Sequence, residues 1–188
     1  MAQPAVRESL DAQHAAFLNS RLLAMPIAGA IAWTGIGIAG ALLPVGAAVW
    51  AMFIGTGMIF YIGIAVSKFT GEDLLGRERK GNYFDHLFMT AVGSAVLVYA
   101  IAIPFFLEDP TSLPLSVGIL TGLMWAPFAG ITRHWIGLFH CITRTVLVVA
   151  AWYAFPHARF VVIPFIIVAI YLVTIAVLAQ RARRLFPT

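Results

Sequence analysis

The chain alternates long apolar stretches with short polar ones, and this pattern predicts membrane-spanning helices. Residues 22–66 contain no charged side chain and no histidine. A helix needs about 20 apolar residues to cross a bilayer, so this stretch predicts two spans, divided near Pro44 and Gly46. Four further apolar stretches follow. The predicted spans are 22–41, 45–66, 87–107, 114–132, 135–155 and 160–180.

The fifth apolar stretch, residues 145–155, is too short to cross the membrane by itself. A full span must begin near Trp135, which draws His140 and Arg144 into the membrane. The alternative is a re-entrant or interfacial segment, which would put the two termini on opposite sides of the membrane.

The distribution of basic residues favours six spans with both termini in the cytoplasm. Of the twelve lysines and arginines, all except Arg144 and Arg159 then lie on the inner side, as the positive-inside rule requires. This topology makes residues 1–21 a polar cytoplasmic segment and residues 181–188 a basic cytoplasmic tail. The polar segment 68–86 becomes a cytoplasmic loop or a short interfacial helix.

Composition supports a single all-α integral membrane domain over residues 22–180. Hydrophobic residues make up 61% of the chain and charged residues only 11%, against about 25% charged in a soluble domain. The net charge of +4 is explained by orientation in the membrane, and we expect no nucleic-acid partner. The polar start predicts no secretory signal peptide. Cys141 is the only cysteine, which excludes an intrachain disulfide. We expect a multi-pass protein of a bacterial cytoplasmic (inner) membrane, with the lipid bilayer as its main partner.

The fourth predicted span carries a stripe of small residues and a proline. Gly118, Gly122, Ala126 and Gly130 are each four residues apart, which predicts a close helix–helix contact within the chain or with another subunit. Prolines within spans can kink helices or free backbone carbonyls, and four are candidates for a functional break: Pro26, Pro104, Pro127 and Pro164. Pro127 is the best candidate because it lies near Arg133.

The fifth predicted span carries the candidate ligand-binding residues. Arg133, Gly137, His140 and Arg144 are spaced by four, three and four, which places them on one helical face. Arg144 lies about 13 Å along the axis from Trp135, close to the bilayer centre. An arginine at that depth costs at least about 3 kcal/mol and needs an anion, carbonyls or water.

Two interpretations of Arg144 remain open. In the structural one, it extends toward the cytoplasm and pairs with Asp85 or with backbone carbonyls. In the functional one, Arg144 and His140 line a water-accessible cavity and bind an anionic ligand, because guanidinium suits carboxylate or phosphate. A third possibility gathers His86, His134, His140 and Asp85 around a metal, but their spacing matches no strong motif and the arginines would repel a cation.

These residues predict a small transporter or channel-like protein for an anionic or polar solute. Arg144, His140 and Arg133 would bind the solute, and Asp85 and His86 would serve as gates or counter-charges. The small size predicts a homo-oligomer. No soluble enzyme signature is present, and we expect neither a bound metal nor a cofactor. The alternatives are an integral membrane enzyme with a cytoplasmic-side His/Asp site, and a scaffold or accessory protein that presents residues 68–86 to a partner.

Overall fold

The computed structural model describes residues 9–75 and 81–186, and for Ala95 only the backbone. Within these residues the chain is entirely helical, without strands. The elements are α1 (Leu10–Leu18), α2 (Ala24–Leu42), α3 (Val45–Thr70), α4 (Tyr83–Leu97), α5 (Tyr99–Glu108), the short 3₁₀ turn η1 (Pro110–Ser112), α6 (Leu113–Leu120), α7 (Trp125–Thr132), α8 (Trp135–Ala154) and α9 (Arg159–Leu185).

Six segments of the described chain are long and apolar enough to cross a membrane, which confirms the predicted number and the all-helical class. Four are single helices, namely α2, α3, α8 and α9. The other two are composite: α4 and α5 form the segment Tyr83–Glu108, and η1, α6 and α7 form the segment Pro110–Thr132. Two predicted spans, 87–107 and 160–180, are extended by several residues because their helices continue beyond the apolar stretch.

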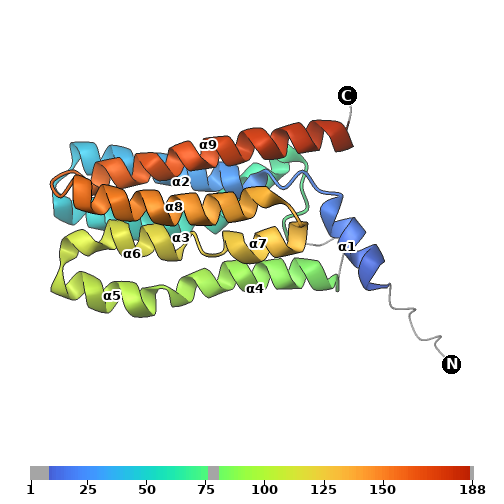
Figure 1. Ribbon diagram of the computed structural model, residues 1–188, viewed down its shortest axis with the longest axis horizontal. Coiled ribbons are helices and arrows are strands. Elements are labelled where there is room, and N and C mark those ends of the chain that lie inside the picture. The colour runs from blue at the N-terminus through green and yellow to red at the C-terminus, as the bar shows by residue number, and fades with distance from the viewer. Residues whose placement is uncertain (1–8, 76–80, 187–188) are drawn as a thin grey trace.

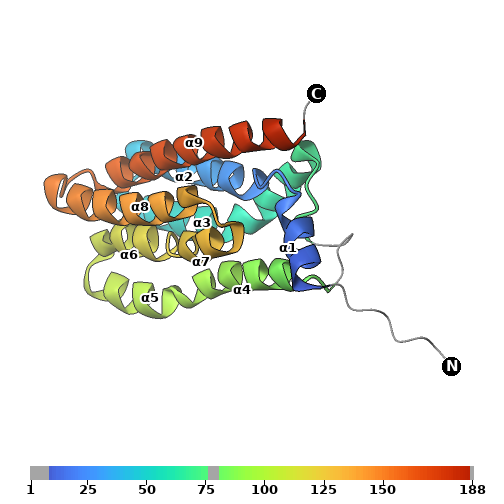
Figure 2. The ribbon, with the colours of Figure 1, turned by 45° about the vertical axis from the view of Figure 1, so that its right-hand side comes forward.

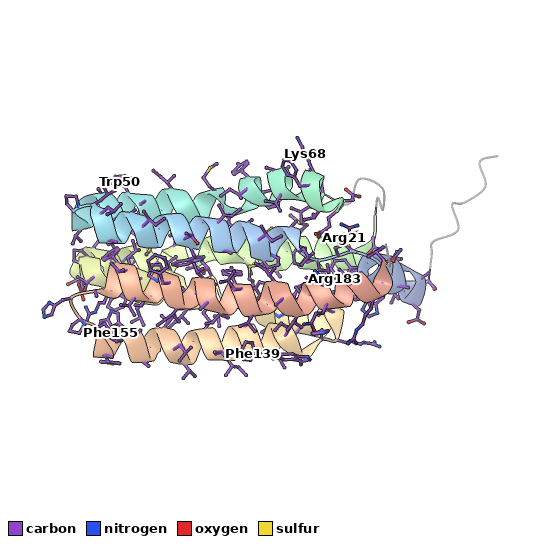
Figure 3. The ribbon with its side chains drawn as sticks, turned by 90° about the horizontal axis from the view of Figure 1, so that it is seen from above. Arg21, Trp50, Lys68, Phe139, Phe155 and Arg183 are labelled. Carbon is purple, nitrogen blue, oxygen red and sulfur yellow. The ribbon has the colours of Figure 1, made fainter. Side chains whose placement is uncertain are left out.

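The six segments run side by side along the long axis of the molecule (Figures 1 and 2). The helix α1 and the C-terminal end of α9 lie at the same end of this bundle (Figure 1). Arg21, Lys68 and Arg183 also lie toward that end, whereas Trp50 and Phe155 lie toward the other (Figure 3). The bundle therefore has a basic end, named here the α1 end, and an opposite end formed by the α2–α3, α5–α6 and α8–α9 connections.

Close packing of α2 against α9 forms one side of the core. A Cβ atom on Gly40 would lie 2.1 Å from the carbonyl oxygen of Phe160, and one on Gly29 would lie 2.3 Å from the ring of Tyr171. No side chain larger than hydrogen fits at either position. These glycines let two membrane helices approach closely and leave room for Tyr171 in the interior.

Hydrogen bonds between loops and helices hold the α1 end together. One carboxylate oxygen of Glu72 accepts the backbone N–H groups of Leu23 and Ala24, both at 2.9 Å, and so caps the start of α2. Part of the predicted polar segment 1–21 forms the helix α1, which is tied to the bundle by a 2.6 Å contact between His14 Nε2 and the Ile131 carbonyl oxygen.

The helices α3, α4 and α5 expose most of their apolar surface. Trp50, Ile54 and Tyr61 on α3 are each more than 60% exposed, as are Leu97 and Ile101 on the α4–α5 segment. Such surfaces suit contact with lipid, since lipid chains are as apolar as these side chains.

Candidate functional site

The fourth spanning segment is broken between α6 and α7, and the break leaves a backbone carbonyl without its helical partner. Pro127 has no N–H and its ring conflicts with the carbonyl of Leu123, so a regular helix cannot continue through this turn. The N–H of Gly122 bonds to the Ile119 carbonyl at 2.8 Å instead of to Gly118. The carbonyl of Gly118 is therefore free to accept from another group.

Arg144 of α8 occupies this break. Its Nε donates to the Gly118 carbonyl at 2.6 Å, one terminal nitrogen donates to the Thr121 hydroxyl at 2.8 Å, and the other donates to the Tyr171 hydroxyl at 3.4 Å. The Gly118 carbonyl belongs to the C-terminal end of α6, where the helix dipole favours a cation. The arginine thus satisfies the backbone of the broken helix.

The space for Arg144 is set by a glycine and by aromatic rings. A Cβ on Gly122 would lie 2.8 Å from Arg144 Cδ, so a side chain at residue 122 would displace the arginine. The guanidinium carbon lies 5.0 Å from the centroid of the Trp33 ring and 5.8 Å from that of Tyr171, within the range of cation–π attraction. Arg144 has no solvent-exposed surface.

The positive charge of Arg144 has no carboxylate partner within salt-bridge distance among the described residues. A guanidinium has five N–H donors, and the three hydrogen bonds above use three of them. Two donors remain without an acceptor in the described part of the chain. Neutral dipoles and rings therefore hold the guanidinium in place without neutralising it.

His140 lies one helical turn before Arg144 and is also fully buried. Its ring stacks on Trp125 with centroids 4.2 Å apart and contacts the edge of Tyr171 at 4.6 Å. Thr174 donates to the Ile170 carbonyl, so its oxygen accepts from His140 Nδ1–H at 2.9 Å. This assignment leaves His140 Nε2 as an acceptor, and that atom has no partner in the structure.

A cavity of about 140 Å³ lies beside the arginine. Thr121 and Tyr171 form part of its wall, and both accept hydrogen bonds from Arg144. Most of the wall is apolar and comes from α2, α3, α4 and the α6–α7 break. Two hydroxyl groups of the cavity wall are therefore in direct contact with the guanidinium.

The structure brings together part of the predicted set. Gly137, His140 and Arg144 form one buried face of α8, as the spacing predicted. Arg133 is not on that face, because α8 begins only at Trp135 and Arg133 is exposed in the α7–α8 turn with φ of 50°. The four-residue face is therefore corrected to three residues.

The suggested gates lie at the α1 end and not at the arginine. Asp85 and His86 are in the first turn of α4, where His86 is exposed and Asp85 lines a separate cavity of about 40 Å³ with Glu72. Arg144 therefore does not pair with Asp85. The structural interpretation also allowed Arg144 to bind backbone carbonyls, and the contact with the Gly118 carbonyl is of that kind.

The proposed metal group is not assembled either, since the described residues contain no cluster of three or more histidine, cysteine or acidic side chains suited to a metal. His140 is enclosed by aromatic rings, whereas His134 caps the start of α8.

The predicted small-residue stripe is interrupted by the helix break. Gly118 faces Val148 and Ile163, and Gly122 faces Arg144, so these two glycines make close contacts with α8 and α9. A Cβ on Gly130 would meet nothing within 4 Å. Ala126, at the start of α7, is half-buried. The stripe is therefore not one continuous packing surface.

Sequence reasoning missed several residues that complete the site. The residues that contact Arg144 or His140 come from three other helices and from the turn between α6 and α7: Trp33, Thr121, Trp125, Tyr171 and Thr174. Tryptophan and tyrosine usually gather at membrane interfaces, so their presence in the middle of spans was a usable signal.

These features define a multi-pass helical bundle, membrane-embedded by the length and apolar character of its six segments, with a buried arginine of α8 packed into the break between α6 and α7. The chain belongs to the family of unknown function DUF7010, whose sequence profile matches residues 13–181. Comparison with curated proteins found no match, and neither did comparison with solved structures.

Proposed function

We propose that the protein is a small membrane transporter or channel-like protein for an anionic or polar solute, and that Arg144 supplies the charge that attracts the solute. The observation that carries this proposal is a fully buried arginine with no carboxylate in contact among the described residues. Arginine stays charged in proteins, and intramembrane charges are costly enough to be kept mainly for function.

The cavity beside Arg144 supports this proposal. Two of its wall groups, Thr121 and Tyr171, already bind the guanidinium, so a small rearrangement of either would bring a solute into direct contact with the remaining N–H donors. Helix breaks at mid-membrane depth are a common place for solute sites in transporters, because they free backbone groups where lipid is excluded.

We further propose that the α1 end faces the cytoplasm. In the described residues this end carries Arg21, Lys68, Arg133 and the arginines at the end of α9, whereas the opposite end carries Arg159. Basic residues concentrate on the cytoplasmic side of multi-pass proteins, which suits a bacterial inner membrane. A homo-oligomer is proposed because six helices enclose little volume, and mass measurement in detergent tests it.

Solute flux from proteoliposomes tests the proposed function. Vesicles loaded with acetate, nitrate or benzenesulfonate should release at least one of these anions faster with the protein than without it. Arg144→Gln should abolish this release, since it removes the charge and the guanidinium fork. Arg133→Gln is the matched control, because it removes an exposed arginine outside the site and should leave the rate unchanged. Equal rates for wild type and Arg144→Gln would overturn the proposal.

A further inference from the structure

The wall of the cavity beside Arg144 contains a hydroxyl group whose hydrogen has no acceptor. Tyr171 is only 5% exposed, and its oxygen accepts a hydrogen bond from Arg144. The structure gives its own O–H no acceptor among the described residues. A buried phenol usually finds one, because an unmade hydrogen bond in an apolar environment costs about 1–3 kcal/mol.

The other hydroxyl groups of the wall have acceptors. Thr121 donates to the Val117 carbonyl at 2.6 Å. Thr56 donates to the Met52 carbonyl at 2.6 Å, and its oxygen lies 2.6 Å from the Tyr99 hydroxyl, which donates to it. Tyr171 is therefore the wall hydroxyl with a free hydrogen in the described part of the chain.

A second unused donor belongs to Trp125, a residue that also lines this cavity. The indole Nε1–H of Trp125 is buried and has no hydrogen-bond partner in the structure. Trp125 is 4% exposed, and its ring lies 6.0 Å from that of Tyr171. Two neighbouring side chains of the cavity wall thus carry donors, and neither donor is satisfied.

The charge behind these donors selects for an anion. Arg144 donates to the Tyr171 oxygen, and a hydroxyl that accepts from a cation becomes a stronger donor itself. Among the described residues no arginine or lysine lines the cavity, but Arg144 donates to two of its wall residues, and this positive charge matches a single negative charge on a ligand.

The remainder of the cavity selects for an apolar body. Met25, Ile59, Phe60 and Val92 line it, and its volume is about 140 Å³. An apolar protein cavity of about 150 Å³ holds a benzene molecule. The cavity therefore suits a body of about that size, next to a charged group at the Tyr171 end.

We propose that the cavity binds a small amphiphilic monoanion of the aromatic or short-chain carboxylate class. Its carboxylate accepts from Tyr171 O–H and Trp125 Nε1–H, and its apolar body fills the space between α3 and α4. This inference rests on the proposed function and names the substrate class of that site.

Ligand-dependent thermal stabilisation of the purified full-length protein in a non-ionic detergent tests the inference, with benzoate as the probe. Benzoate should stabilise the wild type, whereas benzyl alcohol, a neutral molecule of similar size, should have at most a small effect. Octanoate should compete with benzoate, and palmitate should bind no better than benzoate. Tighter binding of palmitate, or equal binding of benzyl alcohol, would show a lipid or a purely apolar occupant and overturn the inference.

Two matched substitutions test the role of the free hydroxyl. Tyr171→Phe should weaken benzoate binding about tenfold or more, because a hydrogen bond to a charged group is lost. Tyr99→Phe removes a hydroxyl from the same wall that is already paired with Thr56, and should change benzoate affinity by less than about threefold. Equal effects of the two substitutions would overturn the inference.

Arg144→Gln distinguishes the inference from the proposed function. If benzoate binding depends on Arg144 but not on Tyr171, the hydrogen bond to Tyr171 inferred here is wrong and the anion site stands. If neither benzoate nor any flux substrate depends on Arg144, both proposals are wrong. If a substitution prevents folding, the series of benzoate, benzyl alcohol and palmitate on the wild type still decides the ligand class.

Discussion

Arg144 in the interior and Arg159 at one end of the bundle each lie over a tryptophan ring, but their other contacts differ. Arg159, at the start of α9, lies 3.9 Å from the Asp109 carboxylate, donates to the Thr111 hydroxyl, and stacks 3.9 Å from the ring centroid of Trp152. Arg144 has two rings, a carbonyl and two hydroxyls, but no carboxylate among the described residues. Within the described part of the chain, the charge of Arg159 has a carboxylate partner and the charge of Arg144 has none.

The difference follows from what each region can reach. At the end of the bundle, loops carry acidic residues, and water screens whatever charge remains. Hydrogen bonds from Thr111 and the nearby Arg159 hold the pKa of Asp109 below its usual value, so this carboxylate stays charged opposite the arginine. In the interior, neutral dipoles hold Arg144, and no carboxylate of the described residues compensates its charge.

Gly122→Leu should produce the largest effect, because it forces a side chain into the space of Arg144. A Cβ at this position would already lie 2.8 Å from Arg144 Cδ and 3.0 Å from its Nε. We expect a loss of about 3 kcal/mol, or failure to fold, since overpacking and loss of the carbonyl contact add together. Thermal unfolding in detergent measures it.

The control for this experiment is Gly130→Leu in α7, where a Cβ would meet nothing within 4 Å. This variant should keep wild-type stability or gain slightly, because leucine favours a helix more than glycine does. Equal losses for the two variants would mean that the interior arginine does not depend on close packing.

Replacing each arginine with lysine should give the next largest effect, with a greater loss of stability at Arg144 than at Arg159. Lysine lacks the planar fork, so Arg144→Lys cannot serve the Gly118 carbonyl and the Thr121 hydroxyl together, and should cost about 2 kcal/mol. Arg159→Lys keeps its charge beside Asp109 at a partly exposed position and should cost about 0.5 kcal/mol. Thermal stability of both variants at two salt concentrations measures this; a larger loss at Arg159 would reverse the comparison.

The sequence predicted the fold better than the site, and the reason is physical. Hydropathy reports burial in lipid over about 20 residues, so six spans followed directly from the apolar stretches. It does not report where a helix breaks. Pro127 suggested a break, but only the structure shows that the chain unwinds over residues 121–124 and exposes the Gly118 carbonyl.

The partners of Arg144 could not be predicted because they come from distant helices. His140 and Arg144 share a face through local spacing, which the sequence displays. Trp33 and Tyr171 reach the same place only through the packing of α2 and α9, which no local pattern encodes. Arg133 was assigned to that face because a continuous helix was assumed, and its left-handed φ ends the helix there.

Asp109→Ala tests whether the end of the bundle depends on its carboxylate. Asp109 accepts from the Thr111 backbone N–H and hydroxyl, both at 2.8 Å, and lies opposite Arg159. The loss should be about 1 kcal/mol, the sum of a helix cap and a weak ion pair. Glu108→Ala is the control, since Glu108 is exposed and should contribute little.

The pH dependence of this contribution follows from the lowered pKa of Asp109. The folded carboxyl binds a proton less readily than the unfolded one, so the stabilisation is complete above about pH 3.8 and is lost as pH falls through the lower folded value. Thermal unfolding of the wild type and Asp109→Ala should therefore converge at low pH. A constant difference at every pH would show that the charge of Asp109 is unimportant.

His134 gives the smallest expected effect and extends the comparison to the α1 end. Burial lowers the pKa of His134, and the nearby Arg181 lowers it further. The unfolded chain therefore takes up this proton more readily, so the contribution is complete above about pH 6.5 and is lost as pH falls through the lower folded pKa. Protonation also removes the Nδ1 lone pair that accepts the Ile136 N–H at 3.2 Å and caps α8.

We expect the free energy of unfolding to fall by about 0.5 kcal/mol between about pH 7.5 and pH 5, at the low end for a helix cap. His134→Asn keeps a capping oxygen that does not titrate, so its unfolding temperature should fall less over the same range. Identical pH profiles of the wild type and His134→Asn would show that other histidines cause the pH dependence. The effect of charge on stability would then be limited to the end of the bundle that holds Arg159.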